Sequence, residues 1–254
     1  MNLSSPFQQL ILPVQQCCQN AFDNFYGESN LKNMSLLKSA LTAQTETLIF
    51  ISGAKGAGKT HLLHAALLFA EEQSRASCYF SMSDFDSQMK ESENMEQFFS
   101  VLNEYSFVIL DDIDALFPEK KAMLPSEQKA KIAIIEESMF NLFNKFKLQG
   151  KQLLFSARKT PSQLNLELPD LKSRLQSGLL LNLKTLDDLQ KQNLLKTIAK
   201  DKGFSLDDDV NAFILKRSGR DLGTLLSLLN TLDKASLTEQ RKLTIPFVKK
   251  ILHW

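Results

Sequence analysis

Apolar runs alternate with helical patterns over the first two thirds of the chain. Near-continuous apolar runs are typical of strands buried on both faces of a parallel sheet. Such runs predict strands at residues 48–52, 77–82, 107–112, 152–156 and 179–183. Between them, apolar residues at helical spacing predict helices around 61–69, 95–102 and 140–146. The pattern therefore predicts an α/β fold, a parallel sheet flanked by helices.

After residue 183 the pattern predicts helices alone, which indicates a small all-helical domain. Gly203 is expected to end the first of these helices, and Ser205 with Asp208 resembles a capping box for the second. Thr244 with Pro246 is expected to begin the last one. The chain is thus expected to comprise a tail (1–21), an α/β domain (22–183) and a helical lid domain (184–254). Residues 115–131, rich in Lys, are expected to form an exposed inserted loop.

Composition describes an ordinary globular protein: 254 residues, 43% hydrophobic and 23% charged, with a net charge of +1. This balance shows no basic excess, so strong direct binding to DNA is not expected. The three cysteines lack the spacing of a metal site or a disulfide framework. Without an apolar run of membrane-spanning length or a signal-peptide pattern, the protein is expected to be cytoplasmic and to have no membrane partner.

A complete phosphate-binding P-loop lies between the first predicted strand and the helix after it, at Gly53–Thr60. Gly53, Gly56 and Gly58 allow backbone N–H groups to close around phosphate oxygens. Lys59 is placed to reach the terminal phosphates, and the Thr60 hydroxyl to ligate Mg²⁺. A tight strand-to-helix turn that merely fits the pattern is the alternative. The flanking elements favour a site for ADP or ATP, with His61 at its end.

Two carboxylates, Asp111 and Asp112, end the third predicted strand. In P-loop ATPases a carboxylate at this position holds Mg²⁺, so Asp111 is the expected partner of Thr60. Asp112 stands where many such enzymes place a Glu that activates water, and an Asp is one methylene shorter. A solvated strand end is the alternative for this pair. One strand intervenes in the chain between the P-loop and the pair, which suggests a sheet with a strand inserted between the two motifs.

The chain resembles AAA+ proteins of the initiator clade, DnaA and its relatives, and within it the Hda family of DnaA regulatory inactivators. The resemblance spans nearly the whole length. It is carried by residues 22–30, the P-loop with its helix (53–64), residues 111–113, 163–166 and 168–171, and the run 241–249. It implies an AAA+ module with a helical lid, in which Phe22 and Phe25 line the adenine pocket. Packing in the core would also explain these two rings.

Arg174 matches the arginine finger of this clade, which reaches into the nucleotide site of a neighbouring subunit. A guanidinium suits that role because it stays charged and bonds phosphoryl oxygens bidentately. The alternative is a surface Arg paired with Asp170 or another carboxylate. The resemblance implies that Arg174 acts in trans on the ATP site of DnaA.

The tail carries Gln9, Leu10, Leu12 and Pro13, which resemble the peptide that binds the DNA polymerase III sliding clamp (beta subunit). A disordered tail or a first strand would explain this short motif as well. With it, the resemblance implies a negative regulator of replication initiation that works with the DNA-loaded clamp on DnaA. Self-association into a homo-oligomer also fits, because AAA+ sites lie at subunit interfaces.

Two positions depart from the family pattern. Arg158 stands in the sensor-1 region, where relatives tend to carry Asp, and Gly223 stands where the sensor-2 Arg is expected. These departures predict weak intrinsic ATPase activity and a P-loop that mainly holds nucleotide. The competing hypotheses are a self-sufficient ATPase that loads a helicase or remodels a protein, and a nucleotide-gated adaptor without a catalytic role.

Overall fold

The computed structural model describes residues 22, 25, 30–84, 92–119, 123–218, 222–239 and 241–254. The chain divides into two compact units. The first holds the sheet and ends at Lys184, and the second consists chiefly of Thr185–Trp254. The predicted tail peptide at Gln9–Pro13 lies outside the described residues.

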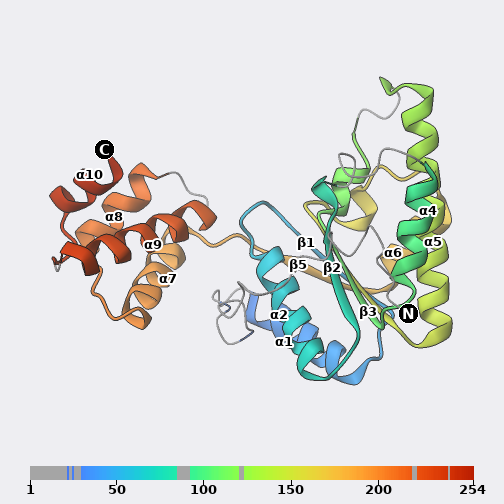
Figure 1. The fold of residues 1–254 in the computed structure, drawn as a ribbon, viewed down its shortest axis with the longest axis horizontal. Helices are drawn as coiled ribbons and strands as arrows, with labels where there is room; N and C mark the ends of the chain where they lie inside the picture. The colour runs from blue at the N-terminus through green and yellow to red at the C-terminus, as the bar shows by residue number, and fades with distance from the viewer. Residues whose placement is uncertain are drawn as a thin grey trace, which may run out of the picture. The chain divides into compact units, whose positions relative to one another are not determined.

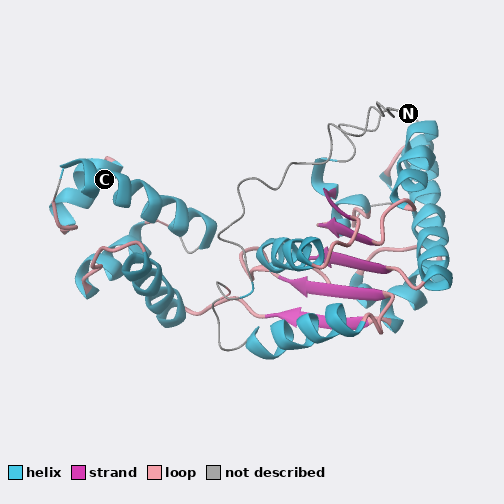
Figure 2. Ribbon diagram, turned by 60° about the horizontal axis from the view of Figure 1, so that its bottom comes forward, coloured by secondary structure: helices cyan, strands magenta, loops and turns pink. Residues whose placement is uncertain are grey.

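Five parallel strands form the sheet in the described part of the first unit, as predicted (Figure 2). They are β1 (Leu48–Gly53), β2 (Ser77–Ser81), β3 (Phe107–Asp111), β4 (Gln152–Ala157) and β5 (Leu179–Leu183). Their order in space is β2-β3-β4-β1-β5. The sheet therefore has a strand inserted between β1, which leads into the P-loop, and β3, which ends in Asp111, as predicted. The inserted strand is β4, which follows both motifs in the chain.

Helices cover both faces of this sheet (Figure 1). On one side lie α1 (Leu31–Ala43) and α2 (Lys59–Glu72), and on the other α4 (Ser92–Leu102), α5 (Ser126–Gln149) and α6 (Pro169–Ser177). Successive side chains of a strand point to opposite faces of the sheet. Val108 and Leu110 of β3 pack in the cluster under α4, α5 and α6. Their neighbour Ile109 is also fully buried. Burial on both faces explains why the three central strands, β1, β3 and β4, are mostly apolar, whereas the edge strands β2 and β5 are only partly buried.

The segment 115–131 is the expected exposed loop only in part, because the two ends of its described residues belong to helices. A short 3-10 helix at Ile113–Leu116 follows β3, and Leu116 and Phe117 are buried in the core. Residues 126–131 belong to α5, which begins directly after Pro125. Leu116 and Phe117 hold the start of the segment in the core, and Lys129 and Lys131 lie within the first turns of α5.

The second unit consists, in its described residues, of α7 (Asp188–Asp201), α8 (Asp208–Arg217), α9 (Leu222–Glu239) and α10 (Ile245–Leu252). They share one core, to which Leu195, Ile214 and Leu229 contribute. As predicted, Gly203 follows the end of α7 with a φ of 86°, and the Thr244 side chain accepts a hydrogen bond from the N–H of Phe247.

The predicted capping box before α8 is wrong. Asp207 is the N-cap residue of this helix, and Asp208 is already its first residue, so Ser205 lies too far upstream to cap it. A capping box occurs at α7 instead, where Asp187 and Gln190 satisfy each other's backbone N–H groups. No helix among the described residues has the length and apolar character needed to span a membrane.

Candidate functional site

The P-loop connects the end of β1 to the start of α2, as its sequence context requires. Gly56 and Gly58 have φ values of 79° and 94°, in the left-handed region that glycine adopts without strain. Gly58 is the N-cap of α2 and offers no capping side chain, so the first turn keeps backbone N–H groups for an anion. This is the geometry of a phosphate-binding helix terminus.

Lys59 and Thr60 occupy the first two positions of α2. The Lys59 ammonium is buried, and its Nζ donates to the carbonyl oxygens of Gly53 at 2.9 Å and Ala54 at 3.5 Å. A buried ammonium held by two P-loop carbonyls lies within the loop that would enclose phosphate groups. The side chain is therefore placed for the role that its sequence position predicts.

The hydroxyl of Thr60 donates to Asp111 Oδ2 at 2.8 Å, so the structure joins the two motifs that the sequence separates by 51 positions. Asp111 is buried at the end of β3 and also accepts from the hydroxyls of Tyr79 (2.8 Å, to Oδ2) and Ser156 (to Oδ1). Hard oxygen ligands on neighbouring elements suit Mg²⁺, which would take its remaining ligands from water and phosphate. The residues present fit the predicted metal site.

Asp112 follows Asp111 in a left-handed backbone conformation, with a φ of 54°. Its N–H donates to Ser156 Oγ at 3.0 Å, and Ser156 in turn donates to Asp111, so one hydroxyl connects both carboxylate residues. Burial raises the pKa of Asp112, and the negative charge of Asp111 adds to the rise. A carboxyl with a raised pKa at this position suits proton transfer better than a solvated strand end does.

The two aromatic residues before the first helix pack against the helix that follows the P-loop. Phe25 lies 5.5 Å from His61, centroid to centroid, and a Cβ on Gly58 would come within 3.0 Å of its ring. Phe22 lies 5.9 Å from Phe69 in an edge-on arrangement. Both rings are buried, so core packing accounts for them, and Phe25 also borders the P-loop directly.

Arg158 is bound to a neighbouring carboxylate. Its Nε lies 3.0 Å from Asp114 Oδ2, and its backbone N–H donates to Asp114 Oδ1 at 3.1 Å. The loops after β3 and β4 are brought together in this way. Gly223 is the second residue of α9 and has no side chain to offer a phosphate. At both positions, therefore, no charged group of the residue itself is left free to contact a phosphate.

Arg174 lies on α6, four residues before Gly178, where a Cβ would lie 2.4 Å from the carbonyl oxygen of Leu48, the first residue of β1. The end of α6 is therefore at the N-terminal edge of the sheet, opposite the P-loop. The guanidinium lies over the Phe143 ring, 5.6 Å from its centroid. Among the residues that the structure describes, no carboxylate lies within ion-pair distance of Arg174, which disfavours pairing with Asp170.

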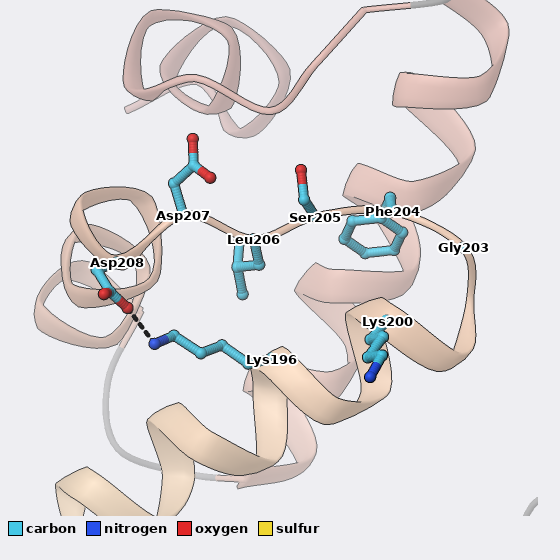
Figure 3. Close-up of a pocket in the computed structure, with 8 residues that line it drawn as sticks. All are labelled: Lys196, Lys200, Gly203, Phe204, Ser205, Leu206, Asp207 and Asp208. Atoms are coloured by element: carbon cyan, nitrogen blue, oxygen red, sulfur yellow. Dashed lines mark ion pairs between the residues drawn. The ribbon is translucent and has the colours of Figure 1, made fainter.

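The second unit contains a shallow hollow of about 630 Å³ between the end of α7 and the start of α8 (Figure 3). Lys196 and Lys200 line one side, Phe204 and Asp208 the other, and Lys196 forms an ion pair with Asp208. None of the predicted site residues lines it.

Sequence reasoning missed Tyr79, His64 and Asp114. Tyr79 lies inside β2 and reaches Asp111 only because β2 pairs with β3, and His64 packs on Tyr79 with 4.8 Å between ring centroids. Burial lowers the pKa of His64, while the charge of Asp111 opposes this effect. A tyrosine in the middle of a predicted strand that neighbours the strand with Asp111 is the signal that could have indicated this contact.

Comparisons with known proteins divide the chain in the same way. A model of the bacterial DnaA ATPase domain matches residues 18–182, and a model of the Hda lid domain matches residues 188–252. A protein of Haemophilus influenzae, described as uncharacterized, is 38% identical over 250 residues, which cover 97% of this chain and 99% of the relative.

Two solved structures show the same fold. Domain III of the replication initiation protein DnaA from Thermotoga maritima superposes with a TM-score of 0.74 at 20% identity, covering 93% of this chain and 96% of that one. DnaA from Aquifex aeolicus, solved with bound AMPPCP, gives a TM-score of 0.69 at 24% identity, with coverages of 87% and 67%.

Proposed function

Since the chain belongs to the DnaA-related AAA+ family, with a lid domain of the Hda type, we propose that it regulates DNA replication initiation by promoting hydrolysis of DnaA-bound ATP. In this function the P-loop holds ADP or ATP with Mg²⁺, and Arg174 enters the ATP site of DnaA. The Gln9–Val14 segment docks on the DNA-loaded sliding clamp, which brings the two AAA+ proteins together.

The observation that carries this proposal is the placement of Arg174. The helix that bears it ends at the N-terminal edge of the sheet, whereas the P-loop of the same chain follows the C-terminal ends of the strands. Arg174 lies four residues, or about 6 Å, before the C-cap residue Gly178, so its backbone is near the edge of the sheet opposite the chain's own P-loop. Without a carboxylate partner among the described residues, its charge remains available to a phosphoryl group of another subunit.

The site of the chain itself supports nucleotide binding more than turnover. Lys59, Thr60 and Asp111 are in place to bind phosphate and metal. The ion pair of Arg158 with Asp114 and the missing side chain at Gly223 leave fewer cations to stabilise the charge that develops on the phosphates. Bound Mg²⁺ would supply electrostatic stabilisation of the phosphate oxygens. The nucleotide is then mainly a structural ligand.

Single-turnover hydrolysis of ATP on DnaA, with clamp loaded on DNA, tests the proposal. Replacing Arg174 by Ala is expected to lower the stimulated rate about 1,000-fold or more, because arginine fingers contribute roughly 10³ to 10⁵ in rate. Arg174→Lys keeps the charge and loses the bidentate geometry, so it is expected to restore only part of the rate. Arg217→Ala, which removes an exposed Arg from the end of α8, is the matched control.

The same experiment separates the competing functions. An Arg174→Ala protein that still stimulates DnaA would contradict the finger. Substantial ATP turnover by the isolated protein, abolished in Lys59→Ala, would indicate a self-sufficient ATPase. If deleting residues 9–14 left the stimulation unchanged, the docking of this segment on the clamp would be refuted while the finger stood.

A further inference from the structure

A carboxylate is buried beneath the start of the helix that bears Arg174. Glu136 lies in the middle of α5 and is only 2% exposed. Its Oε2 accepts the backbone N–H of Leu168 at 2.6 Å and that of Glu167 at 3.0 Å, and Oε1 lies 3.2 Å from the N–H of Glu167. Burying a carboxylate is costly unless it is bonded in this way, so the contact has a specific structural use.

That use is to hold the backbone directly before α6. The N-cap residue of this helix is Leu168, whose side chain has no polar atom, and the first helical residue is Pro169, which has no N–H group. The helix therefore cannot be capped by its own side chain in the usual way. Glu136, on a neighbouring helix, instead accepts the N–H groups of the N-cap residue Leu168 and of Glu167 before it. Its carboxylate therefore lies at the positive end of the α6 dipole.

A second contact fixes the other end of α6 on the same face of α5. Phe143 follows Glu136 by seven residues, two helical turns or about 10 Å, and its ring lies under the Arg174 guanidinium. From Leu168 to Arg174 the rise along α6 is about 9 Å. The distance from Glu136 to Phe143 along α5 thus matches the distance from Leu168 to Arg174 along α6, as expected for two helices that run in the same direction. Leu171 and Leu175 of α6 are fully buried against the same core.

We propose that Glu136 is a positioning residue for the arginine finger: by holding the backbone at residues 167–168 it sets the register of α6 on α5, and with it the placement of Arg174. This inference rests on the proposed function. It adds a residue that touches neither nucleotide nor partner and acts through Arg174 alone. A shift of α6 by a fraction of a turn would carry the guanidinium away from the phosphoryl group that it contacts, which is costly for a transition-state contact.

The test replaces Glu136 by Gln, which keeps the size of the side chain and removes its charge and one acceptor oxygen. Glu137→Gln is the matched control, because it makes the same change at the adjacent, exposed position of α5. We expect Glu136→Gln to lower the maximal rate of DnaA-bound ATP hydrolysis about tenfold. The concentration needed for half-maximal stimulation and the affinity for ADP are expected to stay within twofold of wild type, as are all values for Glu137→Gln.

A double variant separates positioning from general destabilisation. If Glu136 acts through Arg174, Glu136→Gln combined with Arg174→Ala is no slower than Arg174→Ala alone. A slower double variant would overturn the inference, as would a wild-type rate for Glu136→Gln beside an impaired Arg174→Ala protein. An unimpaired Arg174→Ala protein would instead refute the proposed function.

Should Glu136→Gln fail to bind ADP, Phe143→Leu provides the second variant, because it removes the ring under Arg174 and keeps an apolar side chain. The inference is supported if Phe143→Leu lowers the maximal rate by itself but has no further effect in the Arg174→Ala protein, because both contacts then act through the position of α6 on α5. A wild-type rate overturns it.

Discussion

Gly178 separates α6 from β5 and has no room for a side chain. A Cβ at this position would lie 2.4 Å from the carbonyl oxygen of Leu48 and 3.1 Å from its carbonyl carbon. Carbon and oxygen atoms approach comfortably to about 3.3 Å, so Gly178→Ala forces a backbone shift of roughly 0.9 Å. The obstructing atom belongs to the main chain of β1, which is held on both sides by β4 and β5 and cannot rotate away.

Overpacking costs about 1–3 kcal/mol where side chains can adjust, and here they cannot, so we expect a loss of about 3 kcal/mol or more. The melting temperature should fall by about 6–12 °C. Urea unfolding followed by far-ultraviolet circular dichroism measures the change in free energy. Gly150→Ala is the control: its φ of 64° strains an alanine by about 1 kcal/mol, but no atom lies within 4 Å of the added carbon. Equal losses in the two variants would refute the steric reasoning.

Two further predictions concern buried polar groups. Gln152 is fully buried and donates to the carbonyl oxygens of Ala40 (3.1 Å) and Glu46 (3.0 Å). Gln152→Leu should therefore lower the free energy of unfolding in urea by about 1–3 kcal/mol. An unchanged urea midpoint would show that these hydrogen bonds are dispensable. Because burial lowers the pKa of His64 in the folded state, the unfolded chain binds the proton first, and this contribution to stability is lost as the pH falls below about 6.5. His64→Phe should therefore flatten the decline of the melting temperature between neutral and acidic pH, and parallel curves for the two proteins would contradict the assignment.

The strands were predictable because most of them are apolar runs, and all five are confirmed, including the more polar β2. The helices α1 and α6 were not predicted. α6 is short and mostly polar, and its only strong apolar signal is Leu171 with Leu175 at a spacing of four residues. Segments of this kind become helical through tertiary packing, which a local pattern does not contain.

The contacts within the candidate site were predictable only where a known motif carries them. The pairing of Thr60 with Asp111 follows from the motifs, whereas the contact of Tyr79 with Asp111 depends on which strands are neighbours. For Glu136 the sequence contains a weaker signal, because this residue shares a helical face with the buried Ile132, Met139 and Phe143. A charged residue on an apolar face indicates a buried partner, but not that the partner is the backbone of another helix.

The position of β1 in the sheet also has a consequence for how the protein is made. This strand leaves the ribosome before β4 and β5, with which it pairs, and its partner Leu179 lies 130 residues after Ile49. At about 5–20 residues per second, the chain needs roughly 7–26 s to supply the last of these partners. The P-loop is therefore synthesised well before the strands that flank β1, and a nucleotide cannot assist folding until those strands have been translated.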